Sequence, residues 1–200
     1  DGKTLHVRRG SPEYFFGEGL IPRDAAAEWL QSEEEKGHRV LGVSYDDGTG
    51  AHFGGFVSFV DRIKDSTIAT VAAAKQMNVA ITVITGDALK VAEAVGREAG
   101  LVTESAEVTE AAAFLTLPQA ERKKRLSSIR VFARTTPEQK LELIQLLKEQ
   151  FIVGYLGEGI NDAPALKAAH VSMVVQSAAD VARETADIVL LQNDLRVIVE

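Results

Sequence analysis

The sequence predicts an α/β fold, in which a mostly parallel sheet is covered by helices on both faces and is preceded by a small α+β segment. From Phe53 onward, apolar runs typical of strands alternate with amphipathic stretches typical of helices. The strand-like runs are FGGFVSFV, VAITVI, IRVF, IVGYL, VSMVV and DIVLL, and the helical stretches are KDSTIATVAAAKQM, ALKVAEAVGREAG, PEQKLELIQLLKEQ and DAPALKAA. Strands that alternate with helices of this length are joined by crossovers, which favour parallel pairing.

The first part of the chain has a different pattern. A short β-rich stretch is followed by the predicted helix RDAAAEWLQSEEEKG and the predicted strand RVLGVSY, which ends at the turn-forming sequence DDGTG. A segment of this size buries little apolar surface by itself. We therefore divide the chain into residues 1–52 and residues 53–200. Within the second part, residues 103–128 are predicted to be helical and polar.

Composition excludes several classes of protein. The 200 residues carry a net charge of -7, which argues against a nucleic-acid partner because such surfaces are usually basic. The chain has no cysteine, so a bound metal must be held by oxygen or histidine ligands. No apolar run reaches the roughly 18 residues of a membrane span, and the chain opens with Asp-Gly-Lys. We expect a soluble piece of a longer protein.

Three consecutive predicted strands end in polar residues. VAITVI is followed by Thr85-Gly86-Asp87, IRVF by Ala133-Arg134-Thr135, and IVGYL by Gly157-Glu158-Gly159 and Asn161-Asp162. In open parallel sheets, ligands bind where the carboxyl ends of the strands meet. Hydroxyl and backbone N–H groups bind phosphoryl oxygens, and carboxylates bind Mg²⁺. The combination predicts a phosphate and Mg²⁺ site at this edge.

The helix after IRVF places a cation in an unusual position. Thr136 is the predicted N-cap and Pro137 the first helical residue, so Lys140 lies in the first turn. A cation there opposes the helix dipole, which costs a few tenths of a kcal/mol and indicates a nearby anion. Each feature also has a purely structural interpretation, because Thr-Gly-Asp can be a capped turn and lysines are usually surface residues.

These motifs resemble those of P-type cation-transporting ATPases. Thr85-Gly86-Asp87, FARTTPEQK ending at Lys140, and GEGINDAPAL starting at Gly157 look like the three later motifs of that family, in the same order. RGSPE, which starts at Arg9, is similar to the Lys-Gly-Ala-Pro-Glu motif of the nucleotide-binding domain. FVSFVDRIKDST is similar to the Asp-Pro-Pro-Arg segment, and DVARETADIVLLQNDLRVIVE to the segment leading back to the membrane. The tail motifs look somewhat closer to the magnesium-transporting branch than to the calcium or heavy-metal branches.

The resemblance implies a haloacid-dehalogenase-like fold. Residues 53–200 would be most of the phosphorylation domain, and residues 1–52 the C-terminal part of the nucleotide-binding domain. In that family ATP phosphorylates an aspartate with the help of Mg²⁺, and the phosphorylation is coupled to cation transport. The implied partners are ATP, the cation in a membrane domain, the actuator domain and an upstream segment that carries the aspartate. The implied location is the cytoplasmic face of a membrane, as part of an integral membrane protein.

The resemblance also assigns roles to residues, position by position. The implied catalytic residues are Thr85, Lys140, Asn161 and Asp162. The implied metal ligands are Glu158 and Asp162, and the implied nucleotide contacts are Arg9, Gly10, Arg39, Gly86, Asp87 and Arg134.

Departures from the family pattern leave alternatives open. The nucleophile motif Asp-Lys-Thr-Gly-Thr is absent from the 200 residues, so we expect this piece alone to be inactive. Glu158 replaces the usual Asp of Gly-Asp-Gly, and His170 and Ser172 stand where Asp and Gly are common. One alternative is a soluble haloacid-dehalogenase phosphatase, which needs an Asp-x-Asp nucleophile. The other is a nucleotide-binding or regulatory module that has lost turnover.

Overall fold

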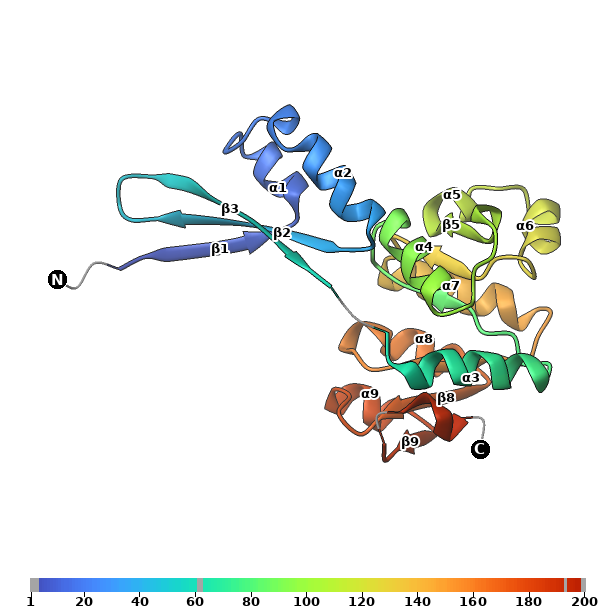
Figure 1. Cartoon of the computed structure of the whole chain (residues 1–200). Coiled ribbons are helices and arrows are strands. Elements are labelled where there is room, and N and C mark those ends of the chain that lie inside the picture. The colour runs from blue at the N-terminus through green and yellow to red at the C-terminus, as the bar shows by residue number, and fades with distance from the viewer. Residues whose placement is uncertain (1–3, 61–62, 193, 199–200) are drawn as a thin grey trace. The chain divides into compact units, whose positions relative to one another are not determined.

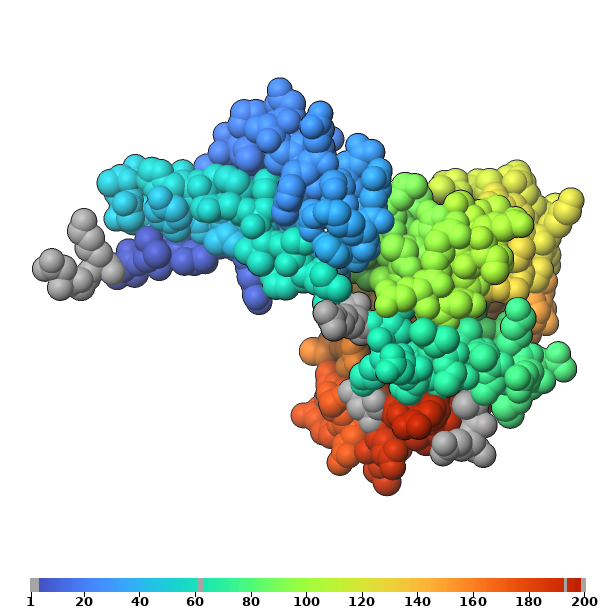
Figure 2. Space-filling model, in the orientation of Figure 1, coloured from blue at the N-terminus to red at the C-terminus, as the bar shows by residue number. Residues whose placement is uncertain are grey.

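The computed structural model describes residues 4–60, 63–192 and 194–198. The chain divides into two compact units, residues 1–62 and residues 63–200. Figure 1 traces the helices and strands of each unit, and Figure 2 shows each unit as a packed body coloured along the sequence. In the described residues, no helix is long and apolar enough to cross a membrane.

The first unit is an antiparallel sheet of three strands with two helices. The strands lie in the order β1-β2-β3, with β1 at His6–Gly10, β2 at Arg39–Asp46 and β3 at Ala51–Phe59. The helical segments are α1 (Pro12–Gly17), the 3-10 turn η1 (Arg23–Ala25) and α2 (Ala27–Glu35). The helix α1 was not predicted, because its six residues are too few to show a helical period.

An aromatic core holds this small unit together. Phe15 is fully buried, and its ring lies so close to β2 that a Cβ atom on Gly42 would come within 2.4 Å of Cδ2. The ring of Phe53 packs edge-on against Phe15 and against Phe56. Trp29 of α2 stacks on Phe56 with ring centroids 5.9 Å apart. Glycine at position 42 is therefore required by the close approach of the helix to the sheet.

A buried carboxylate joins the end of α2 to the sheet. The carboxylate of Glu33 accepts hydrogen bonds from Lys36, from Ser58 of β3 and from His38, which precedes β2. The bonds from Lys36, Ser58 and His38, in that order of size, lower the pKa of Glu33 to about 2. Glu33 is therefore ionised at neutral pH, although its residue surface is only 7% exposed.

The second unit contains two parallel sheets of three strands each. Their orders are β4-β6-β5 and β7-β8-β9. The strands are β4 (Val83–Ile84), β5 (Val108–Glu110), β6 (Val131–Ala133), β7 (Gly154–Gly157), β8 (Val171–Val175) and β9 (Ile188–Leu190). The helices are α3 (Asp65–Gln76), α4 (Leu89–Glu98), α5 (Ala111–Leu115), α6 (Gln119–Arg125), α7 (Pro137–Lys148), α8 (Ala163–Ala168) and α9 (Asp180–Thr185), with 3-10 turns η2 (Ser105–Glu107), η3 (Ile160–Asp162) and η4 (Leu195–Ile198). The predicted α/β class with parallel strands and helices is confirmed.

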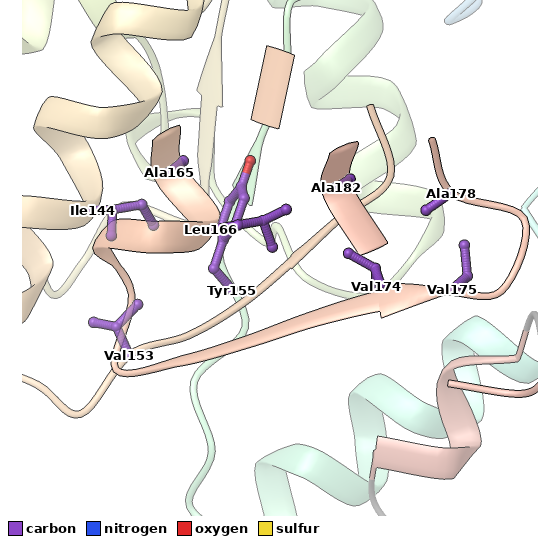
Figure 3. Packing of buried hydrophobic residues seen from close by; sticks show 9 residues of the cluster. All are labelled: Ile144, Val153, Tyr155, Ala165, Leu166, Val174, Val175, Ala178 and Ala182. Atoms are coloured by element: carbon purple, nitrogen blue, oxygen red, sulfur yellow. The ribbon is translucent and has the colours of Figure 1, made fainter. Parts of the chain in front are cut away.

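Helix α7 packs against both sheets. Leu143 is fully buried in a cluster that includes Phe132 of β6, and the neighbouring Ile144 belongs to a second cluster around β7 and β8. Figure 3 shows this second cluster, in which Ile144, Tyr155 and Leu166 lie close together. One amphipathic helix thus covers the core of both sheets. This packing fixes the strand ends that lie near the N-terminus of α7.

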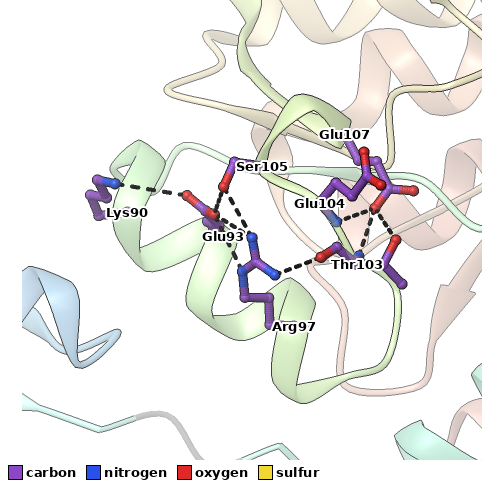
Figure 4. Close-up of polar contacts among 7 residues, drawn as sticks. All are labelled: Lys90, Glu93, Arg97, Thr103, Glu104, Ser105 and Glu107. Carbon is purple, nitrogen blue, oxygen red and sulfur yellow. Dashed lines mark hydrogen bonds and ion pairs between the residues drawn. The ribbon is translucent and has the colours of Figure 1, made fainter.

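Polar contacts hold the connection from α4 to β5, as Figure 4 shows. Arg97 donates to the carboxylate of Glu93, to the hydroxyl of Ser105 and to the carbonyl of Thr103. The backbone N–H of Thr103 in turn donates to Glu107. The segment 103–128 was expected to be helical, but it also contains strand β5, which is stabilised by pairing with β6 and is too short to be visible in the sequence pattern.

The division of the chain falls later than the predicted boundary at residue 52. The FGGFVSFV run forms β3 and pairs with β2, so it belongs to the first unit and not to the alternating part. The Asp61-Arg62 part of the predicted Asp-Pro-Pro-Arg-like segment lies outside the described residues. The VAITVI run forms only the two-residue strand β4, and Val79 at its start is 51% exposed.

Shortening Leu143 tests the packing of α7. Leu143→Ala should lower the free energy of unfolding by about 2–5 kcal/mol, because a fully buried leucine leaves a cavity. The measurement is chemical denaturation of the 200-residue chain followed by circular dichroism. The matched control is Gln145→Ala on the exposed face of the same helix, which should change stability by no more than about 0.5 kcal/mol. Equal effects of the two substitutions would contradict the placement of this helix.

Candidate active site

The end of β4 is a tight turn closed by its own side chains. The hydroxyl of Thr85 donates to the carboxylate of Asp87 at 2.8 Å and accepts from the backbone N–H of Asp87 at 3.1 Å. The backbone of Thr85 is also hydrogen-bonded to β6 and to the segment that follows it. Its N–H donates to the carbonyl of Phe132, and its carbonyl accepts from the N–H of Thr135. The turn is therefore fixed to the neighbouring strand, with Gly86 exposed at its tip.

Arg134 reverses the chain direction after β6. Its φ of 50° lies in the left-handed region, which is unfavourable for a residue with a Cβ. The N–H of Arg134 donates to the carbonyl of Asp87 at 2.9 Å, and its guanidinium pairs with Glu110 at 3.2 Å. The structure thus brings the backbones of Arg134 and Asp87 together.

The start of α7 confirms the predicted cap. The hydroxyl of Thr136 accepts from the N–H of Gln139, and the side chain of Gln139 accepts from the N–H of Thr136. This reciprocal arrangement satisfies two backbone donors at the helix start. Pro137 is the first residue of the helix, and the N–H of Lys140 bonds to the carbonyl of Thr136. Lys140 therefore lies in the first turn, as predicted.

The anion beside Lys140 is a carboxylate of this chain. The Nζ atom of Lys140 lies 2.7 Å from Oδ1 of Asp162, and the two side chains are only 18% and 11% exposed. The pair joins α7 to the loop after β7. A cation in the first turn of a helix interacts unfavourably with the helix dipole. The nearby carboxylate of Asp162 offsets this unfavourable interaction for Lys140.

Asp162 accepts hydrogen bonds on both carboxylate oxygens. Oδ1 accepts from Lys140 and from the hydroxyl of Tyr155 at 3.1 Å, and Oδ2 accepts from the N–H groups of Glu158 and Gly159. Burial raises the pKa of Asp162, but the bonds from Lys140 and the two amides outweigh it, so the pKa lies below its ordinary value. Burial and the nearby Asp162 carboxylate raise the pKa of Tyr155. Asp162 is therefore ionised and Tyr155 neutral at pH 7.

The loop after β7 folds tightly over Asp162. A Cβ atom on Gly157 would lie 2.8 Å from Cβ of Asp162, so only glycine fits at this position. The backbone of Glu158 is held on both sides, because its N–H donates to Asp162 and its carbonyl accepts from Ala179 at 3.0 Å. The side chain of Glu158 is exposed, and so is that of Asn161.

The loop after β7 carries one exposed carboxylate, that of Glu158. Within residues 4–60, 63–192 and 194–198, no three His, Cys, Asp or Glu side chains come together in a group that could hold a metal ion. Mg²⁺ in phosphoryl-transfer sites is commonly bound by one or two carboxylates together with phosphate oxygens and water. An exposed Glu158 on a fixed backbone fits the position of one such carboxylate.

Comparison with known proteins identifies the family. Residues 3–170 match the model of the haloacid dehalogenase-like hydrolases. The chain belongs to this family. The haloacid dehalogenase-like fold expected from the motifs is therefore confirmed.

The similar proteins are P-type ATPases. The magnesium-transporting ATPase, P-type 1, of Escherichia coli K12 is 40% identical over 147 residues, which cover 73% of this chain and 16% of that protein. The zinc-transporting ATPase of Bacillus subtilis is 31% identical over 186 residues, which cover 90% of this chain and 24% of that protein. The crystal structure of a zinc-transporting PIB-type ATPase in the E2.Pi state matches all of this chain and 26% of its own, with a TM-score of 0.62 and 25% identity. The resemblance to P-type ATPases is confirmed.

Two departures from the family motifs have structural partners in this haloacid dehalogenase-like chain. His170 accepts a hydrogen bond on Nδ1 from the N–H of Val153, just before β7. Ser172 donates from its N–H and its hydroxyl to the carboxylate of Asp187, and its hydroxyl accepts from the N–H of Asp187. Both side chains therefore stabilise the sheet β7-β8-β9 at the amino ends of its strands.

The residues assigned to the nucleotide in the first unit lie on both faces of its sheet. Arg9 of β1 pairs with Val43 of β2, and Arg39 precedes Val43 by four residues. Because side chains alternate along a strand, Arg9 and Arg39 share one face. Gly10 pairs with Gly42 and lies on the other face, against which α1 packs. The arginines are therefore the better candidates for a contact with a phosphate-bearing ligand.

Tyr155 was not among the predicted site residues. Its hydroxyl reaches Asp162 from within the apolar strand β7, and the residue is only 9% exposed. The available signal was a polar hydroxyl in the otherwise apolar run IVGYL, seven residues before an aspartate. A hydroxyl in a buried strand needs a hydrogen-bond partner, and the loop directly after the strand is the nearest source of one.

Removing the ammonium of Lys140 should raise the pKa of Asp162. Because this pKa is depressed in the folded chain, the ionised carboxylate stabilises the fold above its unfolded-state pKa of about 3.9, and this contribution is lost as the pH falls through the folded-state pKa. In Lys140→Met the loss should begin at higher pH. The measurement is a titration of ¹³C-labelled aspartate carboxyls by NMR, with the exposed Lys124→Met as control. An unchanged Asp162 pKa in Lys140→Met would contradict the importance of this pair.

Proposed function

We propose that these residues are the cytoplasmic part of an ATP-driven cation pump that is phosphorylated on an aspartate. The observation that carries the proposal is the continuous set of contacts from Thr85 through the start of α7 to Lys140 and Asp162. A hydroxyl, an ammonium group and a carboxylate loop thus meet at the carboxyl ends of parallel strands, which is where phosphoryl groups bind in such sheets. The named functions of the similar P-type ATPases support the same reaction.

Each polar group has a role in this reaction. Thr85 would donate its hydroxyl to the phosphoryl group, and Lys140 would offset the negative charge that the group brings. Asn161 is exposed beside the same loop and would donate from its amide. Asp162 already accepts two hydrogen bonds on each oxygen, which favours a role in holding Lys140 and the loop over direct metal binding. Glu158 is then the carboxylate that remains for Mg²⁺.

Two ligands complete the site. Bound Mg²⁺ would neutralise the charge of the transferred phosphoryl group, with Glu158 as the ligand from this chain. In the second unit, ATP would contact Arg134 and the turn Gly86-Asp87, whose backbones are joined by a hydrogen bond. In the first unit, Arg9 and Arg39 are proposed nucleotide contacts on one face of its sheet.

The rest of the pump would come from other parts of the polypeptide. The chain spans 16% to 26% of the similar proteins described above, so an actuator domain, a membrane domain and the segment with the phosphorylated aspartate are proposed partners. The magnesium-transporting branch is favoured by the 40% identity with the magnesium-transporting ATPase, compared with 31% for the zinc-transporting one. Residues that select the cation would lie in the membrane domain.

The 200-residue chain should not be phosphorylated by ATP. It contains no Asp-Lys-Thr-Gly-Thr motif, so no carboxylate is available to take the γ-phosphoryl group from ATP. The measurement is acid-stable labelling of the purified chain with γ-³²P-ATP and Mg²⁺, with the full-length pump as positive control. Strong labelling of the 200-residue chain would mean that one of its own aspartates is the nucleophile.

Glu158→Asp in the full-length protein tests the metal ligand. The carboxylate is kept, and the exposed side chain and fixed backbone of Glu158 leave the loop undisturbed. Mg²⁺ affinity and the rate of phosphorylation should be equal to the wild type or increased by up to about tenfold, or ~1.4 kcal/mol. Glu158→Gln, which keeps the shape but removes the charge, should weaken Mg²⁺ binding. Loss of Mg²⁺ affinity in Glu158→Asp would show that the site is adapted to glutamate.

A further inference from the structure

Tyr155 brings a hydroxyl group to the edge of an apolar cluster. The residue packs with Ile144, Leu166 and Val174 in the cluster around β7 and β8. Figure 3 shows its ring beside Leu166, with the oxygen atom at the end away from the strand. A buried hydroxyl costs free energy unless it forms a hydrogen bond, and phenylalanine would fill the same space. The packing of the ring therefore does not account for the hydroxyl.

The hydroxyl shares one oxygen atom of Asp162 with Lys140. Oδ1 accepts from Nζ of Lys140 at 2.7 Å and from the hydroxyl of Tyr155 at 3.1 Å. Oδ2 accepts from the backbone N–H groups of Glu158 and Gly159. A phenol keeps its proton at neutral pH, so Tyr155 donates to the carboxylate. In the described part of the chain, Oδ1 thus has two donors, one from β7 and one from α7.

The chain holds these two donors with different firmness. The ring of Tyr155 stands on β7, which pairs with β8, and a Cβ atom on Gly157 would lie 3.2 Å from Cε1 of this ring. Lys140 reaches Asp162 through a long flexible stem, and its side chain is 18% exposed. The ammonium group can therefore turn away from Asp162, whereas the phenol is held by its packing.

A buried carboxylate oxygen can lose one donor at low cost only when another donor remains. Leaving such an oxygen unpaired costs more than the bond itself contributes, because the atom has lost its contact with water. If Lys140 turns toward a second anion, Oδ1 keeps the bond from Tyr155. Asp162 then stays in place, and so do the two N–H groups that its other oxygen accepts from.

We propose that Tyr155 is a positioning residue that holds Asp162 and its loop in place while Lys140 turns toward the phosphoryl group. The identity of this second anion rests on the proposed function. Tyr155 acts through Asp162 and does not touch the phosphoryl group itself. Because the hydroxyl remains on Oδ1, one ammonium group can serve two anions in turn without leaving a buried carboxylate oxygen unpaired.

The first test is a double-mutant cycle in the 200-residue chain, measured by chemical denaturation at pH 7. Tyr155→Phe keeps the ring and removes only the hydroxyl. When Lys140 is present, Oδ1 retains a donor, so the unfolding equilibrium constant should rise only about two- to threefold. In Lys140→Met the hydroxyl is the donor that remains, so the rise caused by Tyr155→Phe should be at least about fivefold larger.

Ser172→Ala is the matched control for this cycle. Ser172 lies opposite Tyr155 in the register of β7 and β8, and its buried hydroxyl donates to the carboxylate of Asp187 at 2.7 Å. The substitution removes a hydroxyl-to-carboxylate bond from the same sheet, so its effect should be equal with and without Lys140→Met. Equal effects of Tyr155→Phe in the two backgrounds would overturn the proposal, because a ring that only fills the core does not depend on Lys140.

The second test uses the full-length protein with inorganic phosphate as the probe. Tyr155→Phe should weaken phosphate binding by about three- to tenfold, because Lys140 can then turn only by leaving Oδ1 unpaired. Phosphate affinity is measured by competition with labelling from γ-³²P-ATP, and the KM for ATP should stay unchanged. An unchanged phosphate affinity would overturn the proposal. If the wild-type protein neither binds phosphate nor is labelled, the proposed function fails, and the double-mutant cycle still decides whether Tyr155 holds Asp162.

Discussion

The ion pair between Lys140 and Asp162 is the interaction on which the rest of the site depends. It connects the first turn of α7, which follows one parallel sheet, to the loop that follows the first strand of the other. Both side chains are mostly buried, so removing one partner would leave a charge without compensation, which typically costs about 3–5 kcal/mol. Burial raises the pKa of Asp162, but the bond from Lys140, together with the two backbone N–H groups, holds this pKa below its ordinary value.

The two acids of the GEGIND loop have different roles because they have different surroundings. Asp162 is buried, and it accepts hydrogen bonds from Lys140, from Tyr155 and from two backbone N–H groups of its own loop. Glu158 is exposed, and its backbone is held while its carboxylate faces solvent. The loop thus holds one buried carboxylate with internal partners and one exposed carboxylate. Gly157 makes this possible, since a side chain there would displace Asp162.

Local chemistry explains which features could be predicted from the sequence. The cap at Thr136, the position of Lys140 and most long helices follow from short-range patterns, and the structure confirms them. Strand β5 and the assignment of β3 to the first unit depend on pairing with strands that are distant in the sequence, which local patterns do not encode. The contact from Tyr155 to Asp162 was missed for a similar reason, because it requires the loop to fold back over the strand.

The position of Lys140 is a compromise between stability and chemistry. Its charge opposes the dipole of α7, by roughly 0.3–1 kcal/mol, and burying it together with Asp162 carries a desolvation cost that a pair of apolar residues would avoid. Helix α7 does not need this pair for its own stability, because Thr136 caps it and Leu143 and Ile144 bury its apolar side. The pair therefore places a charge at the strand ends that the stability of α7 alone does not require. In the proposed reaction, the ammonium group would also offset the charge of a second anion, the phosphoryl group.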